Sequence, residues 1–323
     1  MKATLIYDLD DYKLTPESYS QSYRHMLLAL IEQFRFDTLQ VIHSNDIAPD
    51  PTSDVIIFYD IHSSHHMHVK SIRKHHAIKY EYFDDPHQPE TKGTYQDGTV
   101  IHKLGPQQRC ARALVRGIDY IICPYHNAYF RFLAPYLGDR AESMLIHFPI
   151  SPDPDLFNMR SKPLADRFKA VLGNGAIVGP DDLYTFRKWA FCQSNISYVD
   201  HWLRNNEHPK GINYPDQLLA SYAGALALAS WQAVPKYFEM PLAGCVTFMQ
   251  WNSDAYRAGF RDGENCIFVE KENFNEKINH FLSHIIDYQS IADRGRELVE
   301  HHYTAQHFAN FIYNHIKSHT DIY

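Results

Sequence analysis

The chain has 323 residues, of which 45 % are hydrophobic and 21 % charged, and its formal net charge is −7. This length predicts two domains, and the apolar content is sufficient for two hydrophobic cores. Lysine and arginine are scattered along the chain, so the basic stripe of nucleic-acid-binding proteins is missing and a polyanionic partner is disfavoured.

The cysteines and the N-terminus point to a cytoplasmic protein. All five cysteines are isolated, without a Cys-x-x-Cys pair or a disulfide framework, which fits a reducing compartment. The first short apolar run is followed at once by Asp8, unlike a signal peptide. No window approaches the ~18 apolar residues that a membrane span needs. We therefore expect a cytoplasmic location and no transmembrane segment.

The first half of the chain alternates short apolar runs with helical patterns. Strands are predicted at residues 3–9, 38–43, 55–59, 77–83, 120–123 and 144–148. Helices are predicted at residues 18–34, 107–116 and 126–137. Continuous apolar strands that alternate with helices are typical of a parallel sheet covered on both faces.

A proline-rich segment, residues 148–157, separates this half from the next. Pro149, Pro152 and Pro154 fix their own backbone and restrict the residues before them, so we interpret the segment as a linker. The same alternation then resumes. Strands are predicted at residues 168–172, 196–199, 245–249 and 266–269, and helices at 181–192, 213–228, 235–243, 273–287, 289–301 and 304–317.

This order predicts an α/β fold with two tandem Rossmann-like, doubly wound domains and a helical C-terminal tail. We expect the first domain at residues 1–150, the linker at 151–163, the second domain at 164–303 and a final helix at 304–323. Ligands of such sheets bind at the carboxyl ends of the strands. The site is therefore expected where the two domains face each other.

The most informative segment is residues 234–245, a predicted short helix between two strands. The free N–H groups at the start of such a helix favour a diphosphate, and Lys236 in its first turn adds a charge-assisted contact. Glu239, one turn further on, can accept hydrogen bonds from the vicinal hydroxyls of a ribose. Ala243 and Gly244 allow a close backbone approach. The pattern also fits an ordinary amphipathic helix with a glycine C-cap.

The stretch from Tyr214 to His315 resembles the C-terminal domain of the glycosyltransferase group 1 superfamily, closest to its spore-maturation-type branch. The resemblance rests on Lys236, Phe238-Glu239, Ala243-Gly244-Cys245, Gly263-Glu264-Asn265 before a strand, and His301-His302-Tyr303-Thr304. In the first half, Tyr82 to His87 and Phe148 to Phe157 resemble segments of the same branch.

The resemblance implies a GT-B fold and a nucleotide-sugar donor, a UDP-sugar or GDP-sugar, that the second domain holds. Glu239 matches the glutamate that contacts the ribose, and Lys236 stands where the branch has Arg or Lys. Many relatives carry a second glutamate at the donor sugar, where this chain has Trp231. The family does not generally depend on a metal, so no cofactor besides the donor is expected.

A second candidate for phosphate binding follows the strand at 168–172. Gly173, Asn174 and Gly175 can form a phosphate-facing loop, with Arg187 or Lys188 behind it. The third glycine of a dinucleotide fingerprint is missing, so a plain Asn-Gly turn stays open as the alternative.

In the first half, two polar groups are candidates for the acceptor side. His62, together with Asp60, directly follows the strand at 55–59, and Asp85 lies in the 82–87 segment. His62 or Asp85 could deprotonate the acceptor, and a helix cap with an exposed histidine is the alternative for the first group. The nearby histidines His65, His66 and His68 lack a cysteine or carboxylate that would complete a metal site, so no metal is predicted.

Together these features predict a metal-independent, hexosyltransferase-type glycosyltransferase, with Lys236 and Arg187 neutralising the leaving diphosphate. We favour a retaining reaction over an inverting one; a retaining reaction needs no acceptor base, and His62 and Asp85 then only position the sugar. The alternatives are a nucleotide-sugar epimerase on the same scaffold and a non-catalytic nucleotide-sugar-binding partner subunit, which Trp231 favours. The acceptor can be a glycan, a lipid-linked sugar, a protein or a small molecule; nucleic acid is disfavoured.

Overall fold

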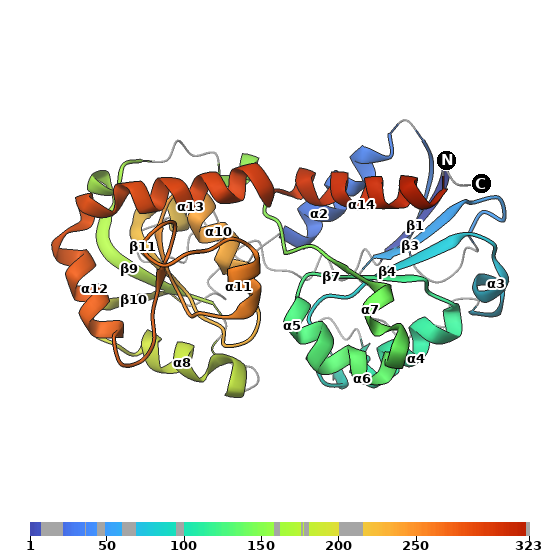
Figure 1. Cartoon of the computed structure of the whole chain (residues 1–323), viewed down its shortest axis with the longest axis horizontal. Coiled ribbons are helices and arrows are strands. Elements are labelled where there is room, and N and C mark those ends of the chain that lie inside the picture. Colours follow the sequence, from blue (N-terminus) through green and yellow to red (C-terminus); the bar gives the residue numbers. More distant parts are fainter. Residues whose placement is uncertain are drawn as a thin grey trace. The chain divides into compact units, whose positions relative to one another are not determined.

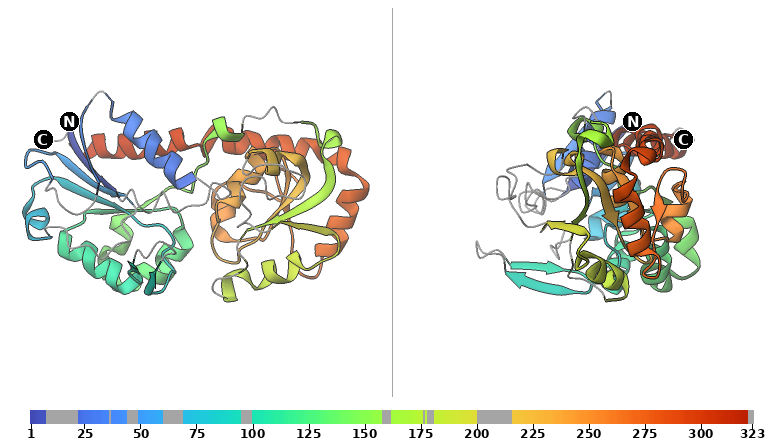
Figure 2. Two further views of the ribbon diagram at one scale, coloured as in Figure 1. Left: turned by 180° about the vertical axis from the view of Figure 1, so that it is seen from behind. Right: turned by 90° about the vertical axis from the view of Figure 1, so that its left-hand side faces the viewer.

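The computed structural model describes residues 1–7, 22–35, 37–43, 49–59, 69–94, 100–157, 162–175, 177, 181–199 and 216–320 (Figure 1). The chain folds into two compact units. The first unit comprises Met1–Leu14, Leu27–Pro149 and Ala309–Tyr323, and the second comprises Thr15–Met26 and Ile150–Phe308. Each unit is built around its own sheet, with helices on both faces (Figures 1 and 2).

The first unit holds a six-stranded sheet in the order β2-β1-β3-β4-β7-β8, and all its neighbours pair in parallel. The strands are β1 (Lys2–Tyr7), β2 (Thr38–His43), β3 (Val55–Tyr59), β4 (Ile78–Tyr82), β7 (Tyr120–Cys123) and β8 (Leu145–His147). This confirms the predicted parallel sheet. The central strand β3 is buried along its whole length, as its unbroken apolar sequence requires.

Helices flank this sheet on both faces (Figure 1). They are α2 (Ser22–Gln33), α3 (Val69–Lys74), α4 (Pro106–Arg116), α5 (His126–Ala128), α6 (Ala134–Leu137) and α7 (Ala141–Met144), with a π-helical turn at Tyr129–Leu133 and a 3₁₀ turn at Gly138–Arg140. An antiparallel pair of strands, β5 (Thr91–Thr94) and β6 (Val100–Lys103), was not predicted from the sequence. Its residues do not form the kind of short, continuous apolar run from which the other strands were predicted.

The second unit holds a five-stranded parallel sheet in the order β10-β9-β11-β12-β13. The strands are β9 (Phe168–Asn174), β10 (Ile196–Val199), β11 (Tyr222–Ala227), β12 (Val246–Met249) and β13 (Ile267–Phe268). The helices are α8 (Asp181–Phe191), α9 (Asp216–Ser221), α10 (Lys236–Leu242), α11 (Ser253–Arg257), α12 (Phe274–Ser283), α13 (Gln289–His302) and α14 (Ala305–Thr320). Short 3₁₀ turns lie at Pro154–Phe157, Leu164–Asp166 and Ile285–Tyr288.

One predicted element of this unit is wrong. The helix expected over residues 213–228 is instead the short helix α9 followed by β11, the central strand of the sheet. Alanine has a high helix propensity, which misled the prediction, but this strand is buried on both faces between close neighbours. A Cβ atom on Gly224 would lie 2.8 Å from the Phe281 ring and 3.1 Å from Val171. Small residues are therefore required here by packing.

The core of the second unit lies on both sides of β11. On one face, Phe274 and Phe281 of α12 pack toward the sheet, and the Phe281 and Phe248 rings lie 5.2 Å apart. On the other face, α10 packs against α13, where a Cβ on Gly295 would lie 2.5 Å from the Asn265 carbonyl oxygen and in ordinary contact with Pro241 of α10 at 3.5 Å. This packing holds α10 against the ends of β11 and β12.

The last helix, α14, joins the first unit from Ala309 onward. There the Tyr313 hydroxyl donates to Asp37 Oδ2 at 2.8 Å, and the Tyr80 hydroxyl lies 3.2 Å from His315 Nδ1. Within the residues that the structure describes, no helix combines the length and the apolar character needed to cross a membrane.

Candidate functional site

The carboxyl ends of β9, β11 and β12 form one edge of the second sheet, because the three strands are adjacent and parallel. Ligands of open α/β sheets bind at this edge. The edge carries the end of β9 at Asn174–Gly175, the segment 228–235 between β11 and α10, and the segment 250–252 after β12. We describe the side chains of these three segments in turn.

The predicted Gly-Asn-Gly loop is partly strand. Gly173 lies inside β9, where a Cβ would come within 2.9 Å of Ile196 Cγ2, so its small size is required by packing against the neighbouring strand. Asn174 ends the strand and donates from Nδ2 to the Val199 carbonyl oxygen at 3.0 Å. Gly175 has a φ of 140°, a conformation that favours glycine, and turns the chain toward Arg187.

Arg187 of α8 links the ends of β9 and β11. Its Nη1 lies 3.5 Å from the position of a Cβ on Gly175, and its Nε donates to the Leu228 carbonyl oxygen at 2.7 Å. The guanidinium carbon lies 3.9 Å from the centre of the Tyr184 ring. The side chain is buried, so this positive charge is fixed at the sheet edge rather than free in solvent.

Lys236 and Glu239 form a buried ion pair at the start of α10, with 3.0 Å between Nζ and Oε2. Their spacing of three residues places them on one face of the helix, as the sequence predicted. They are 5 % and 1 % exposed. Burial lowers the pKa of the Lys236 ammonium, Glu239 opposes that shift, and Arg187 adds to it. The pair brings together the two residues that the sequence assigned to the diphosphate and the ribose.

Ser22 is a third member of this group, which sequence reasoning missed. Its Oγ donates to Glu239 Oε1 at 3.0 Å, so both carboxylate oxygens of Glu239 accept hydrogen bonds. Ser22 begins α2, whose first turn up to Met26 belongs to the second unit. No local pattern signals a contact between residues 217 positions apart.

The segment between β11 and α10 is fixed by Tyr237 and Asn252. The Tyr237 hydroxyl donates to the Gln250 carbonyl oxygen at 2.7 Å and lies 3.2 Å from the amide nitrogen of Ala229. Asn252 Nδ2 donates to the carbonyl oxygens of Ala229 and Gln232 at 3.0 and 3.2 Å. Burial raises the pKa of the Tyr237 phenol, so it remains a neutral donor. The backbone of this segment is therefore held at several points.

Gly244 lies at the other end of α10. Its φ of 76° forms the turn that closes the helix, and its amide donates to the Pro241 carbonyl oxygen at 2.7 Å. At 1.5 Å per residue, it lies roughly 12 Å along the helix from Lys236. The structure thus brings Lys236, Glu239, Arg187 and Gly175 to one sheet edge and does not bring Gly244 there.

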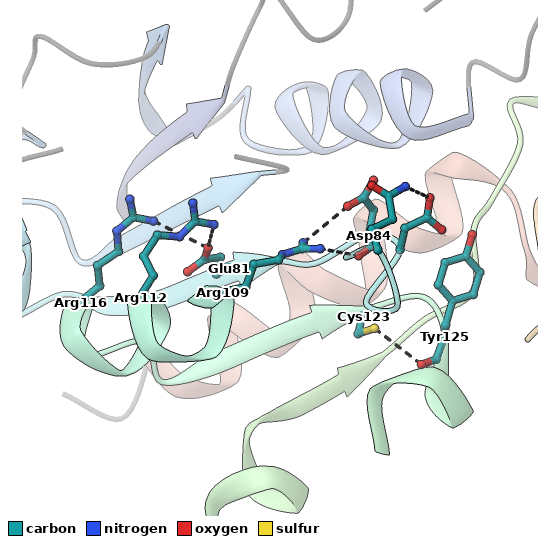
Figure 3. Close-up of polar contacts among 9 residues, drawn as sticks. Glu81, Asp84, Arg109, Arg112, Arg116, Cys123 and Tyr125 are labelled. Carbon is teal, nitrogen blue, oxygen red and sulfur yellow. Dashed lines mark hydrogen bonds and ion pairs between the residues drawn. The ribbon is translucent and has the colours of Figure 1, made fainter. Parts of the chain in front are cut away.

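In the first unit, Asp85 lies in the turn that follows β4. Gln88 Nε2 donates to Asp85 Oδ2 at 2.8 Å. The neighbouring Asp84 is held by Arg109 of α4, whose Nη1 donates to the Asp84 carbonyl oxygen at 2.9 Å and whose Nη2 lies 3.5 Å from Oδ1 (Figure 3). Asp85 is half-buried. The other acceptor-side candidate, His62, lies outside the described residues, as do Asp60, His65, His66 and His68.

A separate buried ion cluster, not predicted from the sequence, lies beside this turn. Glu81 of β4 accepts from Arg112 Nη2 at 2.7 Å, and Arg116 Nη1 lies 3.7 Å from the same carboxylate oxygen (Figure 3). Burial lowers the pKa of Arg116 to about 10, so it stays charged at neutral pH. In the part of the chain that the structure describes, no three His, Cys, Asp or Glu side chains are grouped to hold a metal ion.

The second half of the chain matches a known family. Residues 161–314 match the model of a family described as glycosyl transferase-like. Among curated proteins, no sequence matches this chain.

Solved structures share the fold over almost the whole chain. HepE from Anabaena, in complex with UDP-glucose, is similar over 98 % of this chain and 100 % of its own, with a TM-score of 0.59 and 12 % identity. An alpha-glucosyltransferase in complex with UDP-glucose and DNA containing an abasic site matches over 98 % and 99 %, with a TM-score of 0.57 and 10 % identity. A glycosyltransferase from Rickettsia africae matches over 98 % of both chains, with a TM-score of 0.55 and 9 % identity. The architecture is that of GT-B glycosyltransferases, as the resemblance implied.

Proposed function

Since residues 161–314 belong to the glycosyl transferase-like family, we propose that this protein is a glycosyltransferase that moves a sugar from a nucleoside-diphosphate sugar to an acceptor. The observation that carries the proposal is the buried pair of Lys236 and Glu239. It lies inside the matched region, beside the carboxyl ends of β11 and β12, where a parallel sheet of this kind binds its ligand.

We propose a UDP-sugar as the donor. Two of the proteins that share this fold over nearly their whole length, HepE and the alpha-glucosyltransferase, were solved with UDP-glucose. A uridine nucleotide is therefore the first donor to test, and a guanosine nucleotide is the alternative.

Glu239 is suited to hold the ribose. An ionised carboxylate accepts hydrogen bonds on both oxygens, as Glu239 does here from Lys236 and Ser22. The ribose hydroxyls can reach Glu239 only after the covering side chains move, because the carboxylate is 1 % exposed. A ribose hydroxyl that takes the place of the Ser22 hydroxyl exchanges one donor for another of the same kind, so the carboxylate is never left without a partner.

Lys236 and Arg187 are suited to stabilise the leaving diphosphate. Both are buried cations at the same sheet edge, where the low dielectric strengthens their interaction with the negative charge that develops as the glycosidic bond breaks. Gly175, against which the Arg187 guanidinium lies, leaves space for a phosphate oxygen because it has no side chain. These residues can supply the main charge stabilisation themselves.

On the acceptor side, we propose that Asp85 orients an acceptor hydroxyl and that the reaction retains the anomeric configuration. Gln88 holds one Asp85 oxygen, which fixes the carboxylate in one orientation. A retaining transfer needs this orientation and no acceptor base. His62 stays a prediction for the same role.

One observation favours a second function, a nucleotide-sugar-binding subunit without activity. Trp231, 7 % exposed, stands between β11 and α10 where the resemblance implies a glutamate at the donor sugar. An indole offers one N–H donor and no acceptor. Binding of the donor without release of UDP would identify this second function.

The test has two steps. Thermal unfolding is recorded with UDP, GDP, ADP, dTDP and CMP and with their sugars; a ligand at 100 times its dissociation constant stabilises the folded protein by about 2.7 kcal/mol. We expect one nucleotide to raise the melting temperature of the wild type and not of Glu239→Ala. Release of that nucleotide from its sugar conjugate then separates an enzyme from a binding subunit. A folded wild type that none of these ligands stabilises would refute the proposed function.

A further inference from the structure

Gln232 is a buried amide without hydrogen bonds. Its side chain is 0 % exposed, and within the described structure neither Nε2 nor Oε1 has a hydrogen-bond partner. A primary amide has two donors and an acceptor, and burying them unpaired destabilises the folded protein. Native proteins keep few such groups, and a ligand that completes the hydrogen bonds is one physical reason to keep one.

The main chain around Gln232 is well fixed, so a poorly ordered backbone does not explain why its side-chain amide is unpaired. The carbonyl oxygen of Gln232 accepts from Asn252 Nδ2, and the same Asn252 nitrogen lies 3.1 Å from the Tyr237 hydroxyl. Asn252 is itself fixed, because its Oδ1 accepts from the Ala255 amide at the start of α11. The main chain at Gln232 is thus held by the segment between β12 and α11, and its side chain lies where the described residues offer no partner.

The position of Gln232 relative to the proposed donor residues indicates the ligand. Gln232 lies in the segment 228–235, which runs from the end of β11 to Lys236, the first residue of α10. In a nucleoside-diphosphate sugar, the groups come in the order ribose, diphosphate, sugar. With the ribose at Glu239 and the diphosphate at Lys236, the donor sugar continues past the first residue of α10, on the side from which the segment with Gln232 enters the helix. The nucleobase lies on the other side of the ribose, away from Lys236.

We propose that Gln232 recognises the hydroxyls of the donor sugar, an inference that rests on the proposed function. A sugar hydroxyl is both donor and acceptor, so a pair of them can satisfy Oε1 and Nε2 together. Gln232 is then a specificity residue: it distinguishes a sugar nucleotide from the free nucleotide, and sugars from one another by the orientation of their hydroxyls.

The test compares Gln232→Met with the wild type. Methionine keeps the length of the side chain and removes both polar atoms. Dissociation constants are measured by calorimetry for UDP, UDP-glucose, UDP-galactose and UDP-N-acetylglucosamine, and for GDP and GDP-mannose if GDP is the preferred nucleotide. For the tightest-binding sugar nucleotide, we expect the affinity of the variant to fall by about 3- to 10-fold, as loss of one hydrogen bond implies, while affinity for the free nucleotide changes less than twofold.

Thermal unfolding without ligand gives a second measurement. Because the amide is unpaired, Gln232→Met should raise the melting temperature, by about 2–4 °C for a stabilisation of the size of one hydrogen bond. Gln193→Met is the matched control: Gln193 already donates to the Trp189 carbonyl oxygen at 3.0 Å, so its loss should lower the melting temperature and leave the ratio of the two affinities unchanged.

The outcomes separate this inference from the function on which it rests. A wild type that binds no nucleotide refutes the proposed function itself. Suppose that the wild type binds nucleotide. If Gln232→Met lowers the affinities for free nucleotide and for sugar nucleotide by the same factor, or lowers neither, only the role of Gln232 is overturned. A wild type that binds free nucleotide and every sugar nucleotide with equal affinity overturns it as well.

Discussion

Two buried carboxylates, Glu81 in the first unit and Glu239 in the second, have similar surroundings, and we propose different roles for them. Each is at most 1 % exposed, and each lies within 3.0 Å of a cation. Glu81 lies within β4, between the sheet and α4, whereas Glu239 lies on a short helix beside strand ends. Burial and charge therefore do not by themselves mark a binding site. The two carboxylates differ instead in their position in the fold, which is a strand for Glu81 and a helix beside strand ends for Glu239.

The partners of the two carboxylates differ in a second way. Glu81 pairs with two cations, Arg112 and Arg116, and Arg116 remains charged at neutral pH (Figure 3). Glu239 pairs with one cation, Lys236, and with the neutral hydroxyl of Ser22, and burial lowers the pKa of the Lys236 ammonium. We propose that the Glu81 cluster is a structural element, whereas the Ser22 hydroxyl on Glu239 is exchanged for a ligand hydroxyl. The following predictions test this difference.

The largest effect is expected at Glu81. Glu81→Gln removes the carboxylate that pairs with the buried Arg116 and the partly buried Arg112, and removing one partner of a buried ion pair lowers the free energy of unfolding by about 3–5 kcal/mol. Urea denaturation measures it. Glu32→Gln, which breaks the exposed pair with Arg35, is the control and should change little. Equal losses in both variants would mean that the buried cluster does not stabilise the first unit.

Lys236 should affect turnover more than binding. Lys236→Met removes a cation from the leaving diphosphate and should lower kcat by about 10²- to 10³-fold, with a smaller change in KM. Release of UDP from the preferred sugar nucleotide measures both constants. Lys236→Arg should retain part of the rate, and Lys169→Met, on the exposed side of β9, should retain all of it. A change in KM alone would show that Lys236 only binds the donor.

Glu239→Gln should weaken binding and perturb the fold less than Glu81→Gln does. Loss of a hydrogen bond to a charged group predicts an affinity for UDP that is roughly 10- to 100-fold lower. The free energy of unfolding should fall less than in Glu81→Gln, because Glu81 pairs with two cations and Glu239 with one. Calorimetry and urea denaturation measure the two quantities, with the exposed Glu276→Gln as the control. A larger loss of stability in Glu239→Gln would contradict the comparison.

The smallest effect is expected at His315 of α14. Burial, aided by the neighbouring His319, lowers the pKa of His315 to about 4. It faces the Tyr80 hydroxyl and the Tyr120 ring, next to Asp119. Because the pKa is lower in the folded than in the unfolded chain, this contribution to stability is complete above about pH 6.5 and is lost as the pH falls toward 4. The melting temperature should therefore fall less between pH 7 and pH 5 in His315→Gln than in the wild type. Equal falls would exclude His315 as the cause.

Much of the fold could be predicted because continuous apolar runs predict strands reliably where those strands are buried on both faces of a sheet. Residues 55–59 and 120–123 were assigned as strands with the bounds that the structure gives. The same reasoning was wrong at residues 222–227, where alanines and Gly224 replace the branched residues of an ordinary strand. There the contact with Phe281 determines the sequence, and a partner so distant in the chain leaves no local signal.

The site was predictable only where its residues are close in sequence. The spacing of Lys236 and Glu239 on one short helix was visible in the sequence, and the structure confirms that they face each other. The contact of Ser22 with Glu239 and the unpaired amide of Gln232 depend on tertiary packing. The roles proposed for these residues in donor binding stay predictions until a ligand is placed.

A crystal structure of the protein with UDP tests the central claim most directly. We predict a ribose hydroxyl within hydrogen-bonding distance of the Glu239 carboxylate, in place of the Ser22 hydroxyl, and a phosphate oxygen against Lys236. A nucleotide bound in contact with neither residue would contradict the assignment of this sheet edge as the donor site.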